Sequence, residues 1–258
     1  MYKQTLITFI DILGFKELVA SKSCEEMQQI LRGFYFSSNS HEPASIFDTT
    51  VIQFSDTIVR MKLLRSDSNF ANPSELAWEL KYVANMHQTM LGLGYPLRGA
   101  ITVGEAFWTD RQAFGPGFVR AYELESQFAR FPRILVDPVV VDAFAQANEA
   151  EFENSEMFSR ERTQRKMLID VDGLQYLDCL SLALIIDYFE NDEVTDYFRR
   201  MREVIARCLE SHALQPSILE KYQWLANDYN RCVLRYKYYI DLEGASHTCL
   251  LIPMHSDA

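Results

Sequence analysis

The sequence lacks the features of secreted and membrane-spanning proteins. Its few cysteines are odd in number, widely spaced and free of any CxxC pair, which argues against a disulfide framework and a zinc knuckle; they are Cys24, Cys179, Cys208, Cys232 and Cys249. No apolar run is long enough to span a bilayer, and the N-terminus lacks the small-residue cleavage site of a signal peptide. We therefore expect a soluble, cytoplasmic protein without a membrane partner.

Basic residues are also scarce. The chain has 25 lysines and arginines against 36 aspartates and glutamates, and its formal net charge is -11. Because duplex binding depends on clustered Lys and Arg, this composition argues against a nucleic-acid partner. Apolar residues are abundant: 48% of the 258 residues are hydrophobic, enough to fill a large core. We expect one main domain with an extension.

The first structured segment is predicted to be a buried strand over residues 5–13. Its nearly continuous apolar run suits a strand covered on both faces, and only Asp11 interrupts it. Further on, Ser23 and Glu26 have the spacing of a capping box, which predicts a helix that ends near Ser37.

A β-hairpin is predicted next. Two runs of β-forming residues, 46–54 and 57–64, are joined by Ser55 and Asp56 alone, so Asp56 is expected at the tip of a tight turn. The remaining elements of this half are predicted to be a helix from Pro73 that stops at Gly92 and Gly94, strands at 97–103 and 107–109, a helix at 118–128, a strand at 133–136 and a helix from Asp137 and Pro138. This order favours an α+β sandwich with helices against a mainly antiparallel sheet.

The composition changes beyond residue 148, where a polar and charged stretch follows. A short strand at 167–171 and helices at 194–210 and 217–239 are predicted after it. We therefore expect a core at 1–148 and a mainly helical extension, packed on it, at 149–258.

The extension contains two groups of residues with alternative interpretations. Asp170, Asp172 and Asp178 lie as close in sequence as metal ligands do, but Asp172 precedes a glycine as in an ordinary turn, which is the favoured reading. Three tyrosines recur at helical spacing, and a packed helix face is favoured over a base-stacking surface; they are Tyr222, Tyr229 and Tyr236.

Asp11 and Asp56 are the strongest chemical signal. A carboxylate in an apolar strand is costly unless it is paired, hydrogen-bonded or bound to a metal. The hairpin tip can lie beside the end of the first strand, so the two carboxylates can bridge two divalent ions that hold a triphosphate. In the alternative, Asp11 caps a helix and Asp56 only forms the turn; spacing alone does not choose between them.

The motifs around these residues favour the first interpretation. Residues 9–15 (FIDILGF), 54–56 (FSD), 98–105 (RGAITVGE) and 115–126 (GPGFVRAYELES) resemble, in order and spacing, signatures of the class III adenylate and guanylate cyclase catalytic domain. The resemblance covers about residues 5–136. It implies a ferredoxin-like α+β sandwich and a metal-dependent nucleotide cyclase.

The departures from the family pattern concern both catalysis and base recognition. Val119 stands where the family has its ribose-orienting Asn, and Glu123 where it has its transition-state Arg. Arg98 or Arg120 is then the candidate for the cation that balances charge on the α-phosphate.

The two base-reading positions also differ, since Ile52 replaces the family's Lys and Gln112 its Asp. An adenine-selective pair is therefore absent, whereas amides offer both a donor and an acceptor to a smaller base. The candidate substrate-binding residues are Phe15, Thr50, Ile52, Gln53, Gln112 and Phe114.

With these departures, and with residues 170–178 (DVDGLQYLD) and 221–230 (KYQWLANDYN), the chain resembles the Pycsar pyrimidine cyclases of bacterial anti-phage defence. This resemblance implies a homodimer with active sites at the interface, two Mn2+ or Mg2+ ions per site, and a cyclic UMP or cyclic CMP product that activates a separate effector. The metal roles fall to Asp11 and Asp56, with the carbonyl of Ile12 as an extra ligand. UTP is favoured over CTP on the breadth of the family.

The implied mechanism is an in-line attack of the ribose 3′-hydroxyl on the α-phosphate, with one metal activating the hydroxyl and both stabilising the departing pyrophosphate. Arg120 and residues 112–117 are expected from the subunit opposite the metal pair. Two rivals stay open: a purine cyclase, and a catalytically degenerate cyclase fold that serves as a nucleotide-sensing module.

Overall fold

The computed structural model confirms the α+β class. It describes residues 1–39, 49–64, 73–109, 112–146, 167–181 and 194–254. Within these residues, eight strands form a sheet in the order β2-β3-β1-β4-β6-β8-β7, with β5 paired to β4. Neighbouring strands are antiparallel except β4 and β6, which are parallel. The strands are β1 Lys3–Ile12, β2 Thr49–Phe54, β3 Thr57–Leu63, β4 Leu97–Trp108, β5 Ala113–Phe114, β6 Ile134–Val136, β7 Met167–Ile169 and β8 Gln175–Leu177.

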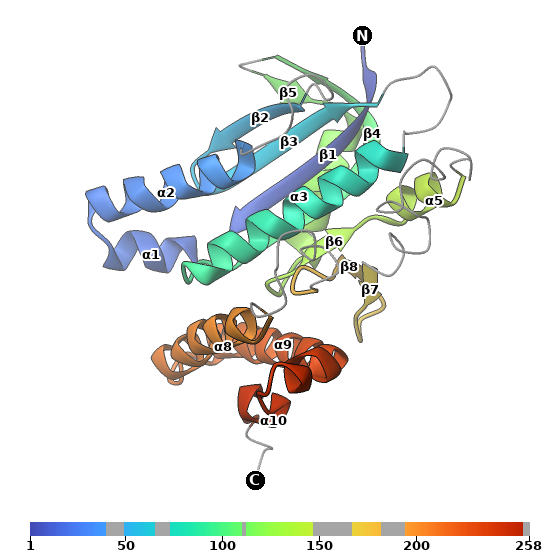
Figure 1. Ribbon diagram of the computed structural model, residues 1–258. Helices are drawn as coiled ribbons and strands as arrows, with labels where there is room; N and C mark the ends of the chain where they lie inside the picture. The colour runs from blue at the N-terminus through green and yellow to red at the C-terminus, as the bar shows by residue number, and fades with distance from the viewer. Residues whose placement is uncertain (40–48, 65–72, 110–111, 147–166, 182–193, 255–258) are drawn as a thin grey trace.

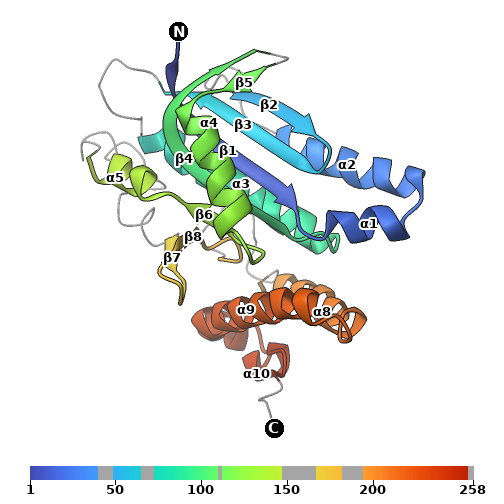
Figure 2. The same ribbon diagram turned by 180° about the vertical axis from the view of Figure 1, so that it is seen from behind.

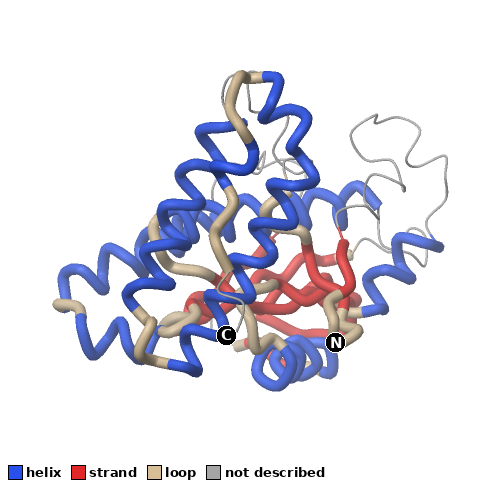
Figure 3. The backbone as a smooth tube through the Cα atoms, turned by 90° about the horizontal axis from the view of Figure 1, so that it is seen from below, coloured by secondary structure: helices blue, strands red, loops and turns tan. Residues whose placement is uncertain are grey.

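Helices cover both faces of the sheet. In Figure 1, α2 and α3 lie on one face, and Figure 2 shows α4 on the other. In the view from below, the C-terminus and the helices around it lie between the viewer and the strands (Figure 3). The helices are α1 Phe15–Ser21, α2 Cys24–Asn39, α3 Pro73–Gly92, α4 Pro116–Glu123 with its π-helical continuation η1 Leu124–Phe128, α5 Pro138–Gln146, α8 Val194–Ser211, α9 Pro216–Leu242 and α10 His247–Leu250.

Most predicted elements are confirmed. The capping box is present, since the Ser23 amide donates to Glu26 Oε2 at 2.8 Å and the Glu26 amide to Ser23 Oγ at 3.2 Å. The hairpin of β2 and β3 turns at Ser55, whose φ is 57°. The separate strand predicted at 107–109 is wrong in part, because β4 continues unbroken from residue 97 to 108. Strand β8 was not predicted.

Strand β1 is apolar at most positions from Leu6 to Ile12 because it separates two hydrophobic clusters. Leu6, Ile10 and Ile12 belong to the larger cluster with α3, whereas Ile7 and Phe9 belong to a smaller one under α4. All five side chains are at most 8% exposed. A strand in the middle of the sheet, covered on both faces, accounts for the continuous apolar run.

A buried ion pair ties α3 to the sheet. Arg60 of β3 donates from Nε and Nη2 to the two carboxylate oxygens of Glu79, each at 2.9 Å, and both side chains are 2% exposed. Thr8 of β1 adds a hydrogen bond to the same carboxylate at 2.8 Å. Burial alone would raise the pKa of Glu79, but the charges of Arg60 and Lys62 and these hydrogen bonds hold it below the ordinary value.

Replacing Glu79 by alanine is expected to lower the free energy of unfolding by about 3–5 kcal/mol, since it leaves a buried arginine without its counter-ion. Denaturant titration measures the loss. Asp196→Ala is the matched control, because Asp196 pairs with Arg199 at the surface, with side chains 55% and 54% exposed. The control should cost about 1 kcal/mol or less. Equal losses in the two variants would contradict the role of the buried pair.

His87 is expected to make the fold sensitive to acid. It lies on α3 and is 1% exposed, and burial lowers its pKa from 6.5 to about 4. The unfolded chain therefore binds a proton below pH 6.5 that the folded chain accepts only near pH 4, so stability falls as the pH drops through that window. Across it we expect His87 to account for a loss of about 3 kcal/mol. Unfolding of His87→Leu at pH 7 and pH 4.5 should show a smaller loss than wild type; identical losses would contradict this account.

The C-terminal helices share the main hydrophobic core. Phe198 and Met201 of α8 belong to the same cluster as Leu80 and Met90 of α3. The predicted packing of the α9 tyrosines is confirmed, because all three are at most 8% exposed; they are Tyr222, Tyr229 and Tyr236. No helix in the described ranges is long and apolar enough to cross a membrane. The boundary at residue 148 stays a prediction.

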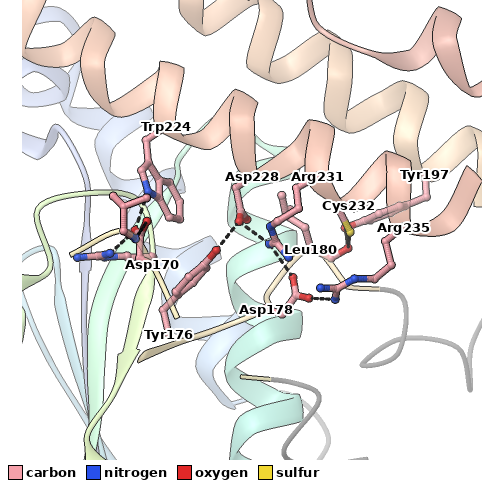
Figure 4. A network of polar contacts seen from close by, with 12 residues as sticks. Asp170, Tyr176, Asp178, Leu180, Tyr197, Trp224, Asp228, Arg231, Cys232 and Arg235 are labelled. Atoms are coloured by element: carbon pink, nitrogen blue, oxygen red, sulfur yellow. Dashed lines mark hydrogen bonds and ion pairs between the residues drawn. The ribbon is translucent and has the colours of Figure 1, made fainter. Parts of the chain in front are cut away.

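A polar network joins α9 to the last strands (Figure 4). Tyr176 donates to Asp228 at 2.8 Å, and Asp178, which is fully buried, accepts from Arg231 at 3.3 Å and from Arg235. Trp224 donates from Nε1 to Asp170 at 2.8 Å.

The three aspartates that resembled metal ligands are therefore occupied by other partners. Arg133 binds Asp170 and Asp172, and the arginines of α9 bind Asp178. The predicted turn at Asp172 is confirmed by the bond from the Gly173 amide to the Asp170 carbonyl at 2.9 Å.

Candidate functional site

Strand register brings the predicted site residues together. Asp11 stands opposite Thr57 on β3 and opposite Arg98 on β4, so the three lie abreast across the sheet. The Ile12 amide donates to the Asp56 carbonyl at 3.2 Å, which holds the tip of the β2–β3 hairpin against the end of β1. The predicted proximity of the hairpin tip and the first strand is therefore confirmed.

The Asp11 carboxylate is crowded and only partly neutralised. Its side chain is 14% exposed, and it accepts from Thr57 Oγ1 at 3.3 Å and from Arg98 Nη2 at 3.1 Å. Burial, followed by a hydrogen bond and the charge of Asp56, raises the pKa of Asp11 to about 7, against the opposing effect of Arg98. Two neighbouring carboxylates and one guanidinium leave excess negative charge at this point.

Glu125 is a third acid at the site, which the sequence analysis did not select. Its Oε1 lies 3.0 Å from Arg98 Nη2, although the two are not aligned as a hydrogen bond. The side chain is 4% exposed, and burial, together with the charge of Asp56, raises its pKa against the effect of Arg98. The available signal was the i, i+4 spacing from Ala121, which places Glu125 on the buried face of the helix.

A close contact between two glycines lets helix α4, which continues into the turn that carries Glu125, pack directly on strand β4. A Cβ on Gly104 of β4 would lie 2.8 Å from the Gly117 Cα, so α4 can approach the sheet only with glycine at both positions. The helix then widens to the π-helical turn η1, where Glu125 sits. Such turns are rare and occur often at functional sites.

The carboxylates at this site fit a hard divalent cation whose remaining ligands come from substrate and water. In the part of the chain that the structure describes, no three His, Cys, Asp or Glu side chains are grouped as a complete metal site. Mg2+ and similar ions are commonly held by only two carboxylates together with substrate phosphates and water. Asp11 and Asp56, whose negative charges repel one another, meet that requirement, and the main chain of Ile12 is hydrogen-bonded to that of Asp56.

An apolar pocket of about 390 Å³ lies beside the site, on the α4 face of the sheet. Ile52 and Gln112, two predicted base-reading positions, line it. Its other walls come from β1, β2, β3, β5 and α4, namely Phe9, Phe54, Thr57, Val59, Ala113, Phe118 and Tyr122. The pocket is predominantly apolar with a terminal amide at its edge, as sites for small aromatic ligands are.

The other predicted substrate residues do not line this pocket. Thr50 accepts from Trp108 Nε1 at 3.0 Å, and Gln53 donates to the carbonyls of Leu31 and Ser55, each at 3.3 Å. Phe114 is 47% exposed and packs against Phe107, and Phe15 begins α1. Their roles in substrate binding stay predictions.

The two candidate cations are placed differently. Arg98 contacts Asp11, whereas Arg120 forms a two-pronged pair with Asp137, at 2.9 and 3.2 Å, and its pKa is raised by that hydrogen bond. Thr102 Oγ1 also donates to the Asp137 carboxylate, at 2.8 Å. Within one chain, Arg98 is therefore brought to the carboxylate pair and Arg120 is not.

Comparison with known proteins gives structural likenesses at low identity. No family profile and no curated protein matches the chain. The adenylyl cyclase CyaB from P. aeruginosa is 17% identical, with a TM-score of 0.46, over 69% of this chain and 94% of that chain. The guanylyl cyclase Cya2 is 15% identical, with a TM-score of 0.43, over 58% and 81%.

A third likeness is to the dimeric guanylyl cyclase domain of the RhoGC fusion protein from the aquatic fungus Blastocladiella emersonii. It is 12% identical, with a TM-score of 0.43, over 68% of this chain and 93% of that chain. At these identities and TM-scores the choice of a reaction rests on the chain's own residues.

Proposed function

We propose that the protein is a metal-dependent pyrimidine nucleotide cyclase that converts UTP to 3′,5′-cyclic UMP and pyrophosphate. The observation that carries the proposal is the Asp11–Asp56 carboxylate pair at the end of β1, with the Arg98 guanidinium 3.1 Å from Asp11. The ribose 3′-oxygen forms a bond to the α-phosphorus. The bond between the α-phosphorus and the oxygen that bridges it to the β-phosphorus breaks. The hydroxyl proton passes to solvent and pyrophosphate leaves.

Asp11, Asp56 and the carbonyl of Ile12 would hold Mn2+ or Mg2+, two ions per site. When bound, these ions lower the pKa of the 3′-hydroxyl and neutralise charge on the α-phosphate and the pyrophosphate. Arg98 supplies a further positive charge 3.1 Å from Asp11, beside the carboxylates that would hold the ions. Thr57 fixes the Asp11 carboxylate by its hydrogen bond.

The pocket beside the carboxylates supports a pyrimidine base. Ile52 and Gln112 line it in place of a charged adenine-reading pair, and the Gln112 amide offers one donor and one acceptor group. A uracil edge presents both kinds of group. UTP is the favoured substrate, and CTP, giving cyclic CMP, is the alternative.

A homodimer is proposed because the rim of the pocket is apolar and exposed. Of the lining residues, Phe54 is 80% and Tyr122 52% exposed, and Val119, on the same helix as Tyr122, is 51% exposed. Exposed apolar side chains that lie together mark contact surfaces. A second subunit on this face would bring its Arg120 and residues 112–117, with the pocket that its own Ile52 and Gln112 line, to the partner's carboxylate pair. The cyclic product would act on a separate effector in anti-phage defence, in the cytoplasm.

The second candidate function is a nucleotide-sensing module without catalysis. It is favoured by Val119 and Glu123, which stand where the resembled family has a ribose-orienting Asn and a transition-state Arg. The crowded carboxylate pair argues for catalysis instead, because two neighbouring carboxylates with a single guanidinium beside them repel one another unless a metal ion is bound.

Incubation with each of the four ribonucleoside triphosphates and Mn2+, followed by mass spectrometry of the products, tests the proposal. Cyclic UMP from UTP is expected, with less product from CTP and none from the purines. A cyclic purine product would point to a purine cyclase. Binding without any product would support the sensing module.

A further inference from the structure

Among the residues that the structure describes, Arg133 is the most enclosed cation outside the candidate site. It precedes β6, and its side chain is 1% exposed. Its guanidinium binds the carboxylates of Asp170 and Asp172 and lies 5.5 Å from the ring centre of Phe131. Its Nε has no hydrogen-bond partner among the described residues, so these two acids largely fix the position of the group.

Helix α9 completes this enclosure through one residue, Trp224. Figure 4 shows its indole directed at Asp170, to which Nε1 donates at 2.8 Å. The ring stacks on Phe131, with centres 5.7 Å apart and planes at 9°. Helix α9 therefore helps to fix Asp170, the carboxylate that binds Arg133.

Two links lead from Arg133 to the candidate site. Its carbonyl accepts from the Gly99 amide at 3.1 Å, directly after Arg98. Its Nη2 lies 3.5 Å from the carbonyl of Phe128, the last residue of η1. That turn is closed by the Ala129 amide, bonded to the Leu124 carbonyl at 3.0 Å, and it carries Glu125, the partner of Arg98.

We propose that Arg133 and Trp224 are positioning residues of the reaction, through which α9 holds η1 and the start of β4 so that the Arg98–Glu125 pair faces Asp11. A small displacement of a charged group at such a site has a large effect on rate, because electrostatic stabilisation depends on preorganised geometry. The kinetic consequence rests on the proposed function, whereas the effect on backbone order does not.

The test compares Trp224→Phe with Tyr176→Phe. Each variant removes one aromatic hydrogen-bond donor between α9 and the sheet region, but only the first loosens Asp170 and Arg133. Arg133→Lys is the second variant, since it keeps the charge and loses the fork that spans Asp172 and Phe128. Turnover of UTP with Mn2+, melting temperature and amide hydrogen exchange are measured for all three.

Trp224→Phe is expected to lower kcat by roughly tenfold with little change in KM, and to speed amide exchange in 124–129 and 98–99. Tyr176→Phe should lower the melting temperature similarly while leaving kcat and both segments unchanged. Equal kinetic and exchange effects in the two variants, or none in Trp224→Phe and Arg133→Lys, would overturn the proposal. If wild type turned over no triphosphate, the proposed function would fail, and the exchange data would still decide whether α9 orders η1.

Discussion

Replacing Asp56 by asparagine is expected to lower metal-dependent turnover by roughly a thousandfold or more, because divalent ions supply several kcal/mol of transition-state stabilisation. Asp11→Asn should have the same effect. Both changes preserve side-chain shape and remove one negative charge from the pair. Initial rates of pyrophosphate release at saturating Mn2+ measure the loss.

The same variants should fold at least as stably as wild type. Asp56 raises the pKa of Asp11, so its negative charge opposes ionisation of the neighbour, and removing it relieves repulsion in the metal-free protein. Asp142→Asn, an exposed carboxylate change on α5, is the matched control and should retain full turnover. Full activity in Asp56→Asn would show that the pair does not bind the catalytic metal.

Arg98→Met is expected to lower kcat by roughly a hundredfold to a thousandfold, the loss typical of one preorganised group that stabilises developing charge. It also leaves Glu125, which is 4% exposed, without its cation, so the melting temperature should fall. Arg98→Lys distinguishes the effect of the positive charge from that of its position. It keeps the charge, but an ammonium replaces the guanidinium whose Nη2 contacts both Asp11 and Glu125.

Arg120→Met tests the alternative cation. If Arg98→Met kept wild-type kcat while Arg120→Met lost it, the transition-state cation would come from the α4 arginine of the opposite subunit. Loss in both variants would mean that each contributes one charge.

The parts of the fold that could be predicted from the sequence are those set by local chemistry. The capping box at Ser23 and Glu26, the turn at Ser55 and the helix from Pro73 each depend on residues a few positions apart. Strand β8, three residues long and paired to β6 only through Leu135 and Tyr176, has no periodicity that a sequence window can detect.

In the candidate site, too, the residues that could be predicted are those that local sequence patterns mark. Asp11 interrupts an apolar run and Asp56 occupies a tight turn, so both are visible in the sequence. Glu125 was missed because its spacing from Ala121 predicts only that it is buried, whereas its contact with Arg98 depends on how the π-helical turn η1 lies on β4. The choice between Arg98 and Arg120 was open for the same reason: strand register, rather than residue type, places Arg98 beside Asp11.

The base pocket shows the limit of motif spacing. Ile52 and Gln112 line one pocket although 60 positions separate them, while Gln53, adjacent to Ile52, faces the opposite side of β2 and bonds to Leu31 on α2. Alternation along a strand explains the difference, since neighbouring side chains point to opposite faces. Candidate residues next to each other on a strand cannot share one pocket wall.

The most direct test of the central claim is the stoichiometry of products from UTP and Mn2+, measured for wild type and Asp56→Asn in parallel. The account predicts one cyclic UMP per pyrophosphate in wild type, and neither product above background in the variant. Linear UMP or orthophosphate in place of cyclic UMP, or equal yields from the two proteins, would contradict it.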